Sequence, residues 1–81
     1  MRVHLGGHLN WYDPQKRAWQ ELALAEPVSL TELLQLLRVP PDEIGVAAVN
    51  GNAVSLEDAV VSDGDCVEFY PPIGGGYLMP I

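Results

Sequence analysis

Apolar and polar residues alternate over two stretches near the start of the chain, a pattern typical of β-strands. Over residues 2–9 the apolar positions Val3, Leu5 and Leu9 are separated by polar ones, which predicts a first strand. The Gly6-Gly7 pair interrupts this alternation and indicates a bulge or bend. After a turn at Asp13-Pro14, alternation resumes over residues 18–25 and predicts a second strand, so that the two form a hairpin.

A helix of residues 30–38 is predicted next. Ser29 and Glu32 have the spacing of a capping box, in which the serine hydroxyl accepts from the backbone N–H of the glutamate and the glutamate bonds back. Arg38 favours the negative pole of the helix, and Pro40-Pro41 forbids its continuation. Four leucines form one apolar stripe at helical spacing and are expected in the core: Leu30, Leu33, Leu34 and Leu37.

The hairpin signal Asn50-Gly51 joins two further predicted strands. A type I′ turn needs φ > 0 at both central residues, and this dipeptide adopts that conformation readily. Residues 46–49 precede the turn and residues 52–54 follow it. Pro41 to Ile44 is predicted to form a single turn before them, and Ser55 opens a short helical turn that reaches Val60.

The last predicted strand is residues 66–70. Asp63-Gly64-Asp65 forms the turn before it, with a glycine free to take φ > 0. Val67 and Phe69 lie on one face and are expected in the core, whereas the intervening positions lie on the other. Pro71-Pro72 ends the strand because proline has no N–H to donate. One helix beside one mixed sheet makes a two-layer α+β domain.

Composition limits the classes of partner. The chain of 81 residues is sufficient for one domain with a modest core, and its net charge of −7 includes only four Lys and Arg. Nucleic acid is therefore not an expected partner, whereas a basic protein is. Since no apolar run approaches the ~20 residues of a membrane span and no signal-peptide-like stretch is present, we expect a cytoplasmic protein that does not enter membranes.

No constellation of catalytic or metal-ligating residues is recognisable. Cys66 is the single cysteine, so neither an internal disulfide nor a Cys-pair zinc site is possible, and a packing role is expected. His4 and His8 share a face of an undistorted strand but have no third ligand at an informative spacing. We expect no bound cofactor, no metal and no enzymatic activity. Trp11 and Trp19 suit either packing in the core or the hairpin, or exposed anchoring of a partner.

Three motifs resemble a known family. These are V-N-G at residues 49–51, L-E-D at residues 56–58 and D-G-D-C-V-E-F-Y-P-P-I-G-G-G at residues 63–76. The combination resembles the C-terminal half of the ubiquitin-like sulfur carriers, the MoaD and ThiS proteins of molybdopterin and thiamine synthesis. The resemblance implies the β-grasp fold, with one helix across a four- to five-stranded mixed sheet and the first and last strands parallel at its centre. It also implies a domain of residues 1–73 and a flexible Gly-rich tail of residues 74–81.

The resemblance implies that the reactive group is the C-terminal carboxylate after Gly75 and Gly76. An adenylating enzyme similar to the ubiquitin-activating family uses ATP to activate Gly76, and sulfur then replaces AMP to give a thiocarboxylate. A sulfur-accepting synthase subunit is the implied second partner. Glycines lack the side chains that would obstruct a narrow adenylating pocket. On the residues alone, the glycine run also suits a flexible tether.

Residues 77–81 depart from the family pattern, in which the glycines end the protein. The resemblance implies that a protease, often of the JAMM type, cuts between Gly76 and Tyr77. A cut after Gly75 would also leave a Gly-Gly end, and the apolar extension instead suits a structural role on the exposed sheet face. We expect residues 74–81 to be poorly ordered because so few residues bury too little surface to offset their backbone entropy.

A partner surface is predicted around the end of the last strand. Tyr70, Pro71, Pro72 and Ile73 are expected to form an apolar centre ringed by acids such as Glu68. Two other functions remain open: a modifier conjugated to other proteins through Gly76, and a β-grasp interaction module that is never activated. The pathway served, whether molybdopterin or tungstopterin, thiamine or an amino acid, is not determined by these residues.

Overall fold

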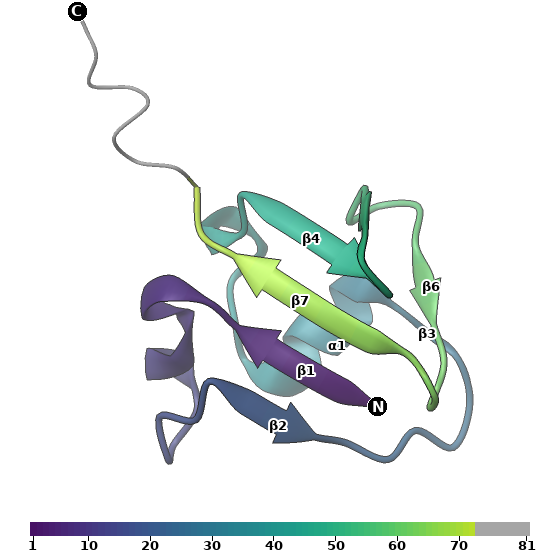
Figure 1. The fold of residues 1–81 in the computed structure, drawn as a ribbon, viewed down its shortest axis with the longest axis horizontal. Helices are drawn as coiled ribbons and strands as arrows, with labels where there is room; N and C mark the ends of the chain where they lie inside the picture. The colour runs from purple at the N-terminus through teal and green to yellow at the C-terminus, as the bar shows by residue number, and fades with distance from the viewer. Residues whose placement is uncertain (73–81) are drawn as a thin grey trace, which may run out of the picture.

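The computed structural model describes residues 1–72 (Figure 1). Along the chain lie β1 (Arg2–Leu5), η1 (Gly7–Tyr12), β2 (Trp19–Glu21), β3 (Val28–Ser29), α1 (Leu30–Leu37), η2 (Pro41–Glu43), β4 (Val46–Val49), β5 (Asn52–Val54), β6 (Val60–Val61) and β7 (Cys66–Tyr70). The elements η1 and η2 are 3₁₀ helices: η1 follows β1, and η2 precedes β4.

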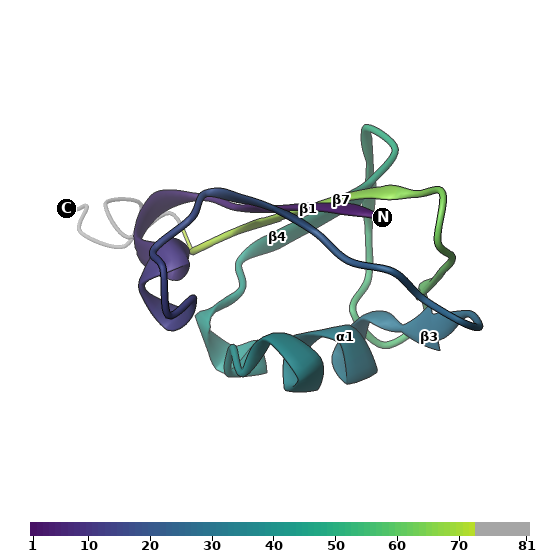
Figure 2. The same ribbon diagram turned by 90° about the horizontal axis from the view of Figure 1, so that it is seen from below.

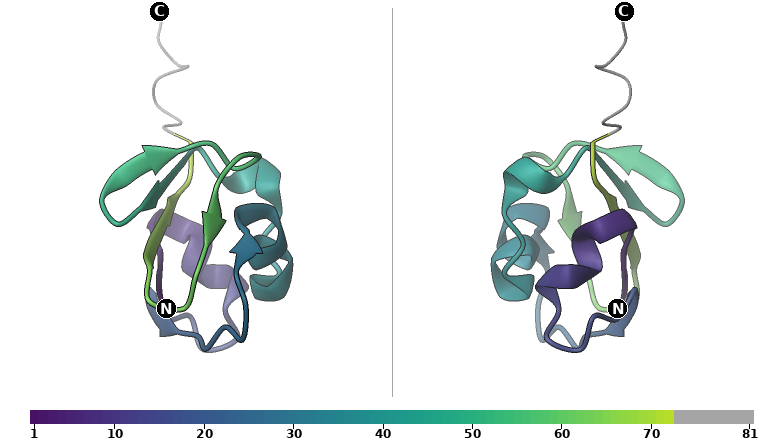
Figure 3. Two further views of the ribbon diagram at one scale, coloured as in Figure 1. Left: turned by 90° about the vertical axis from the view of Figure 1, so that its right-hand side faces the viewer. Right: turned by 90° about the vertical axis from the view of Figure 1, so that its left-hand side faces the viewer.

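Five strands form one mixed sheet in the order β2-β1-β7-β4-β5. Strands β1 and β7 pair in parallel at its centre, and the other neighbours are antiparallel (Figure 1). Helix α1 covers one face of the sheet, which confirms the α+β, β-grasp prediction (Figure 2). The short strands β3 and β6 pair as a separate two-stranded ribbon beside the helix (Figure 3).

The helix begins as predicted and ends one residue early. Both bonds of the capping box are present, with Glu32 N–H donating to Ser29 Oγ at 3.1 Å and Ser29 N–H donating to Glu32 Oε1 at 3.0 Å. Arg38 follows the helix as its C-cap, in the left-handed conformation with φ 61°. Its predicted place inside the last turn is therefore wrong, and its N–H instead donates to carbonyls of that turn.

The core lies between α1 and the inner face of the sheet. Leu30, Leu33 and Leu34 are fully buried, as predicted, whereas Leu37 is only partly buried. Val67 and Phe69 of β7 meet the helix with no exposed surface. The remaining fully or nearly fully buried apolar residues are Met1, Val3, Leu5, Leu9, Val39, Ala47 and Val61.

The first predicted strand is too long. β1 stops at Leu5, and Gly7, with φ 56°, turns the chain into η1. Leu9 is buried in the core from this 3₁₀ helix rather than from a strand. Its apolar side chain therefore fitted the alternating pattern although no strand is present there. His4 and His8 consequently lie on different elements. Within residues 1–72 no group of three His, Cys, Asp or Glu is placed to bind a metal.

Other local predictions hold in part. Asn50 and Gly51 have φ 52° and 87°, which confirms the positive-φ hairpin turn. Gly64 does not adopt positive φ, so that expectation is wrong, although the turn is present. The second strand is shorter than predicted because only Trp19–Glu21 pairs with β1. Val60 belongs to strand β6, beyond the turn predicted to reach it.

An ion pair between the buried Asp13 and the exposed Arg17 lies in the loop between η1 and β2. Asp13 is 4% exposed and accepts from the Arg17 backbone N–H and Nε at 2.9 Å each, while Arg17 Nη2 donates to its second oxygen at 3.1 Å. The hydrogen bond from the Arg17 side chain is the main cause that lowers the pKa of Asp13 to about 2. The ionised Asp13 carboxylate thus accepts the hydrogen bonds that hold this loop.

We expect the ion pair of Asp13 and Arg17 to stabilise the fold fully above pH 4. Its contribution to the free energy of unfolding should be lost as the pH falls toward 2. The folded-state pKa lies below the ordinary value of 3.8, so the folded state resists protonation that the unfolded chain accepts. An Asp13→Asn variant should therefore melt below the wild type at pH 7, and the difference should shrink between pH 4 and pH 2. A difference in melting temperature that is constant across this range would contradict the assignment.

Candidate functional site

Strand β7 leaves the domain from the centre of the sheet. Both of its edges are paired, to β1 as far as Phe69 and to β4 as far as Tyr70. Beyond β1, the Gly6 N–H donates to the Phe69 carbonyl at 2.8 Å, and beyond η2 the Gly45 N–H donates to the Tyr70 carbonyl at 2.7 Å. The last backbone carbonyls of the strand are therefore fixed from both sides before Pro71 and Pro72 continue the chain without a donor N–H.

The sheet face opposite the helix, here called the outer face, presents side chains that alternate with the core positions. An aromatic row crosses β2, β1 and β7: the His4 ring centroid lies 4.6 Å from that of Trp19 and 5.5 Å from that of Tyr70. The Arg2 guanidinium carbon lies 4.4 Å from the centroid of the Trp19 ring. Trp19, Tyr70 and the neighbouring Val46 are all exposed, so this face offers apolar surface to a partner.

Tyr70 and Glu68 form a polar edge to this row. The Tyr70 hydroxyl donates to Glu68 Oε2 at 3.1 Å. Burial raises the pKa of Tyr70, and the hydrogen bond to Glu68 raises it further. The phenol therefore remains protonated at neutral pH and keeps its ring oriented beside the carboxylate.

The structure brings four predicted partner-binding residues together. Tyr70 lies on the outer face at the end of β7, as predicted, with Glu68 two residues before it and partly exposed. Pro71 is half-buried and Pro72 is exposed at the point where the chain leaves the sheet (Figure 1). The other predicted site residues, Ile73, Gly75, Gly76 and Tyr77, lie outside the described residues, as do the expected order of residues 74–81 and the cleavage point.

The tryptophans separate into two environments. Trp19 packs across the hairpin against His4 and Arg2 on the outer face, which combines hairpin packing with 41% exposure. Trp11 on η1 is 72% exposed, so a core position for it is wrong. It borders a shallow groove with Leu36 and Leu37 of α1 on the helix side of the domain.

Sequence reasoning missed several residues near the site. His4 was not assigned to the partner surface, and Trp19 was offered as a partner anchor without a place beside Tyr70, since both approaches depend on the pairing of β1 with its two neighbours. Three glycines also contact the segment from Tyr70 to Pro72: Gly6, Gly7 and Gly45. The local sequence indicated only a bend at the first two and the start of a strand at the third. The only signal in the sequence is the presence of glycine itself at these three positions.

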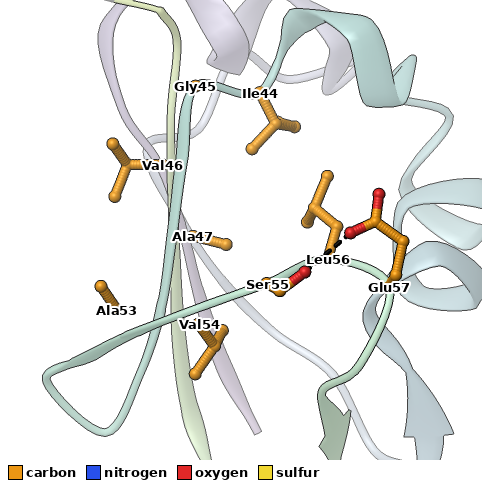
Figure 4. Close-up of a pocket in the computed structure, with 9 residues that line it drawn as sticks. All are labelled: Ile44, Gly45, Val46, Ala47, Ala53, Val54, Ser55, Leu56 and Glu57. Carbon is orange, nitrogen blue, oxygen red and sulfur yellow. Dashed lines mark hydrogen bonds between the residues drawn. The ribbon is translucent and has the colours of Figure 1, made fainter.

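A second hollow lies between the β4–β5 hairpin and the turn that follows it (Figure 4). Ile44, Ala47, Val54 and Leu56 give it an apolar lining. Its polar groups are Ser55 and Glu57, and the Ser55 hydroxyl donates to the Glu57 carboxylate at 2.7 Å. This bond lowers the pKa of Glu57, so the carboxylate is a poor general base.

The fold and the projecting strand end define a ubiquitin-like protein of the β-grasp type. The ThiS family model matches residues 10–76, and the chain therefore belongs to the ThiS family of ubiquitin-like sulfur carriers. None of the helices in the described residues is long and apolar enough to span a membrane.

Two solved structures from Geobacter metallireducens are similar to this chain. The crystal structure of a thiamine biosynthesis protein (ThiS) is 28% identical, covers 85% of this chain and 90% of its own, and has a TM-score of 0.52. The NMR solution structure of a thiamine biosynthesis protein is 28% identical, covers 100% of this chain and 95% of its own, and has a TM-score of 0.53. Comparison with curated proteins gives no match.

Proposed function

We propose that this protein carries sulfur for thiamine biosynthesis as a thiocarboxylate on Gly76, after removal of residues 77–81. The observation that carries the proposal is the family match, which extends through Gly76 and leaves the apolar extension outside it. The similar solved structures, both described as thiamine biosynthesis proteins, support thiamine over molybdopterin as the pathway.

The chemistry is that of a main-chain carboxylate. The Gly76 carboxylate attacks the α-phosphorus of ATP, and pyrophosphate leaves to give an acyl-adenylate. Sulfide displaces AMP and leaves the thiocarboxylate directly. If a persulfide attacks instead, the product is an acyl disulfide, and a second thiol must reduce its S–S bond to release the thiocarboxylate. The adenylating enzyme binds the ATP and supplies the catalytic groups, so the carrier is a substrate in this proposal rather than an enzyme.

The outer face and the end of β7 are the proposed docking surface for that enzyme. Tyr70, Trp19 and Val46 are exposed on the outer face, and Glu68 adds negative charge at its edge. The C-terminal arm, which begins at Pro71, continues from the end of β7 beside Tyr70. An aromatic anchor next to carboxylates suits a partner with an apolar pocket and a basic rim. The net charge of −7 favours encounter with such a basic surface.

A Tyr70→Ala variant is expected to bind the adenylating enzyme roughly 30-fold more weakly, since an anchor of this kind contributes about 2 kcal/mol. Isothermal titration with the purified enzyme measures the dissociation constant. The matched control is Trp11→Ala, which removes an exposed aromatic from the helix side of the domain and should leave the affinity unchanged. Equal affinities for Tyr70→Ala and wild type would remove Tyr70 from the docking surface.

Intact-mass measurement of the protein purified from its native cells tests the function itself. The proposal expects a chain that ends at Gly76, and a fraction that is about 16 Da heavier because sulfur replaces one oxygen. Isopeptide adducts through Gly76 would instead indicate a protein modifier. An intact chain that ends at Ile81 would indicate an interaction module that is never activated. Loss of growth without added thiamine on deletion of the gene, restored when thiamine is supplied and without loss of molybdoenzyme activity, would identify the pathway.

A further inference from the structure

The adjacent pair Gly6-Gly7 and the distant Gly45 contact the end of β7 and the two prolines that follow it. A Cβ atom added to Gly45 would lie 2.4 Å from Pro72 Cα and 2.6 Å from Pro72 N. One added to Gly7 would lie 2.8 Å from Pro71 Cγ, and one added to Gly6 would lie 2.5 Å from Tyr70 Cδ1. Real Cβ atoms do not approach other heavy atoms within 3.0 Å, so a side chain at Gly45 displaces the Pro72 backbone, and one at Gly6 or Gly7 displaces the ring of Tyr70 or Pro71.

Backbone conformation does not account for two of these glycines. Gly6 has φ −80° and ψ 163°, which any residue adopts, and Gly45 is not among the residues with positive φ. Only Gly7, with φ 56°, has a conformation that itself favours glycine. The absence of a side chain at Gly6 and Gly45 is therefore explained by the close approach of Tyr70 and Pro72.

Hydrogen bonds from two of these glycines hold the end of β7, just before the arm. The Gly6 N–H donates to the Phe69 carbonyl and the Gly45 N–H donates to the Tyr70 carbonyl, one from each side of β7. An ion pair or hydrogen bond joins the two flanking 3₁₀ helices, with His8 Nε2 of η1 2.9 Å from Glu43 Oε1 of η2. The base of the arm is thus enclosed by η1 on one side and by the η2–β4 junction on the other.

We propose that Gly6, Gly7 and Gly45 form a glycine seat that fixes where, and in which direction, the C-terminal arm leaves the domain. This inference rests on the proposed function. The three glycines act as positioning residues, because they orient the arm and do not touch the reacting atoms. Adenylation requires the reacting atoms to be held within about 3–3.5 Å of each other. A fixed base sets the point from which the chain beyond Pro72 extends toward the adenylating pocket when the domain is docked.

The test compares Gly45→Ala with Gly64→Ala, both in a chain that ends at Gly76. Gly64 also lies on the surface without positive φ, but a Cβ there meets nothing within 4 Å, so it is the matched control. For Gly45→Ala we expect kcat for ATP–pyrophosphate exchange to fall about 10- to 100-fold with KM for the carrier nearly unchanged, because the outer face still docks. Gly64→Ala should match wild type in both constants.

Amide hydrogen exchange gives a readout that does not depend on activation. The N–H of residue 45 should exchange faster in Gly45→Ala than in wild type, because its bond to the Tyr70 carbonyl is lost with the displaced arm, while Gly64→Ala leaves it protected. If wild type itself is never activated, the proposed function fails, and the exchange data alone decide whether the seat exists. A folded Gly45→Ala protein with wild-type kcat and wild-type protection would overturn the proposal.

Gly6→Ala provides a second variant in case Gly45→Ala does not fold. Its added Cβ meets mainly the Tyr70 ring, a side chain that moves more easily than the Pro72 backbone. We expect a folded protein with lower kcat and faster exchange of the Gly6-position N–H. Wild-type values for both quantities would likewise overturn the seat.

Discussion

Full-length protein is expected to be inert in ATP–pyrophosphate exchange, whereas a chain that ends at Gly76 is expected to be activated. In the longer chain Gly76 is joined to Tyr77 by an amide, which has no free carboxylate oxygen to attack ATP. The exchange rate of the full-length chain should therefore lie below the detection limit of the assay, because an amide cannot react with ATP in this way. The assay uses the adenylating enzyme from the same organism with each purified chain.

Two further chains sharpen this result. Gly76→Ala in the trimmed chain should slow activation sharply, since its methyl group enters the adenylating pocket, but should leave the melting temperature unchanged. A chain that ends at Gly75 decides between the two possible cleavage points. Equal activation of the full-length and trimmed chains would refute the need for processing.

Leu34→Ala is expected to reduce the free energy of unfolding by about 2–5 kcal/mol. Leu34 is fully buried on the stripe of α1 that faces the sheet, and a small domain has little stability in reserve. Urea denaturation at pH 7 measures the loss. Leu36→Ala is the matched control, because Leu36 lies in the same helix but is 64% exposed, and the same truncation there should cost far less. Equal losses at the two positions would show that the helix is packed in another orientation.

Features that depend on a few adjacent residues were predictable from the sequence. The capping box at Ser29 and the turn at Asn50-Gly51 each arise from local hydrogen bonding or local φ preference, and both are present. The alternation of Val67 and Phe69 with Tyr70 correctly placed the two faces of β7, because one face of this strand meets the core. The place of Tyr70 on the outer face could therefore be predicted from the alternation within β7 itself.

Features that depend on residues distant in the chain were missed. The ribbon between β3 and β6 joins two segments of two residues each, which are too short to show any periodicity. The contact of Gly45 with Pro72 depends on the pairing of β4 with β7, and Gly6 reaches Tyr70 only because β1 lies parallel to β7. Local sequence patterns carry no information about these approaches.

The parallel pairing of β1 and β7 determines how the domain bears mechanical load. The two strands run in the same direction, so a pull on the C-terminal arm against a fixed N-terminus slides one strand along the other. All register pairs from Arg2 with Cys66 to Leu5 with Phe69 then carry the force together in shear, instead of opening one after another as at a peeled edge. A pull on the arm therefore acts on a central strand that is paired on both sides, to β1 and to β4, and not on a strand at the edge of the sheet.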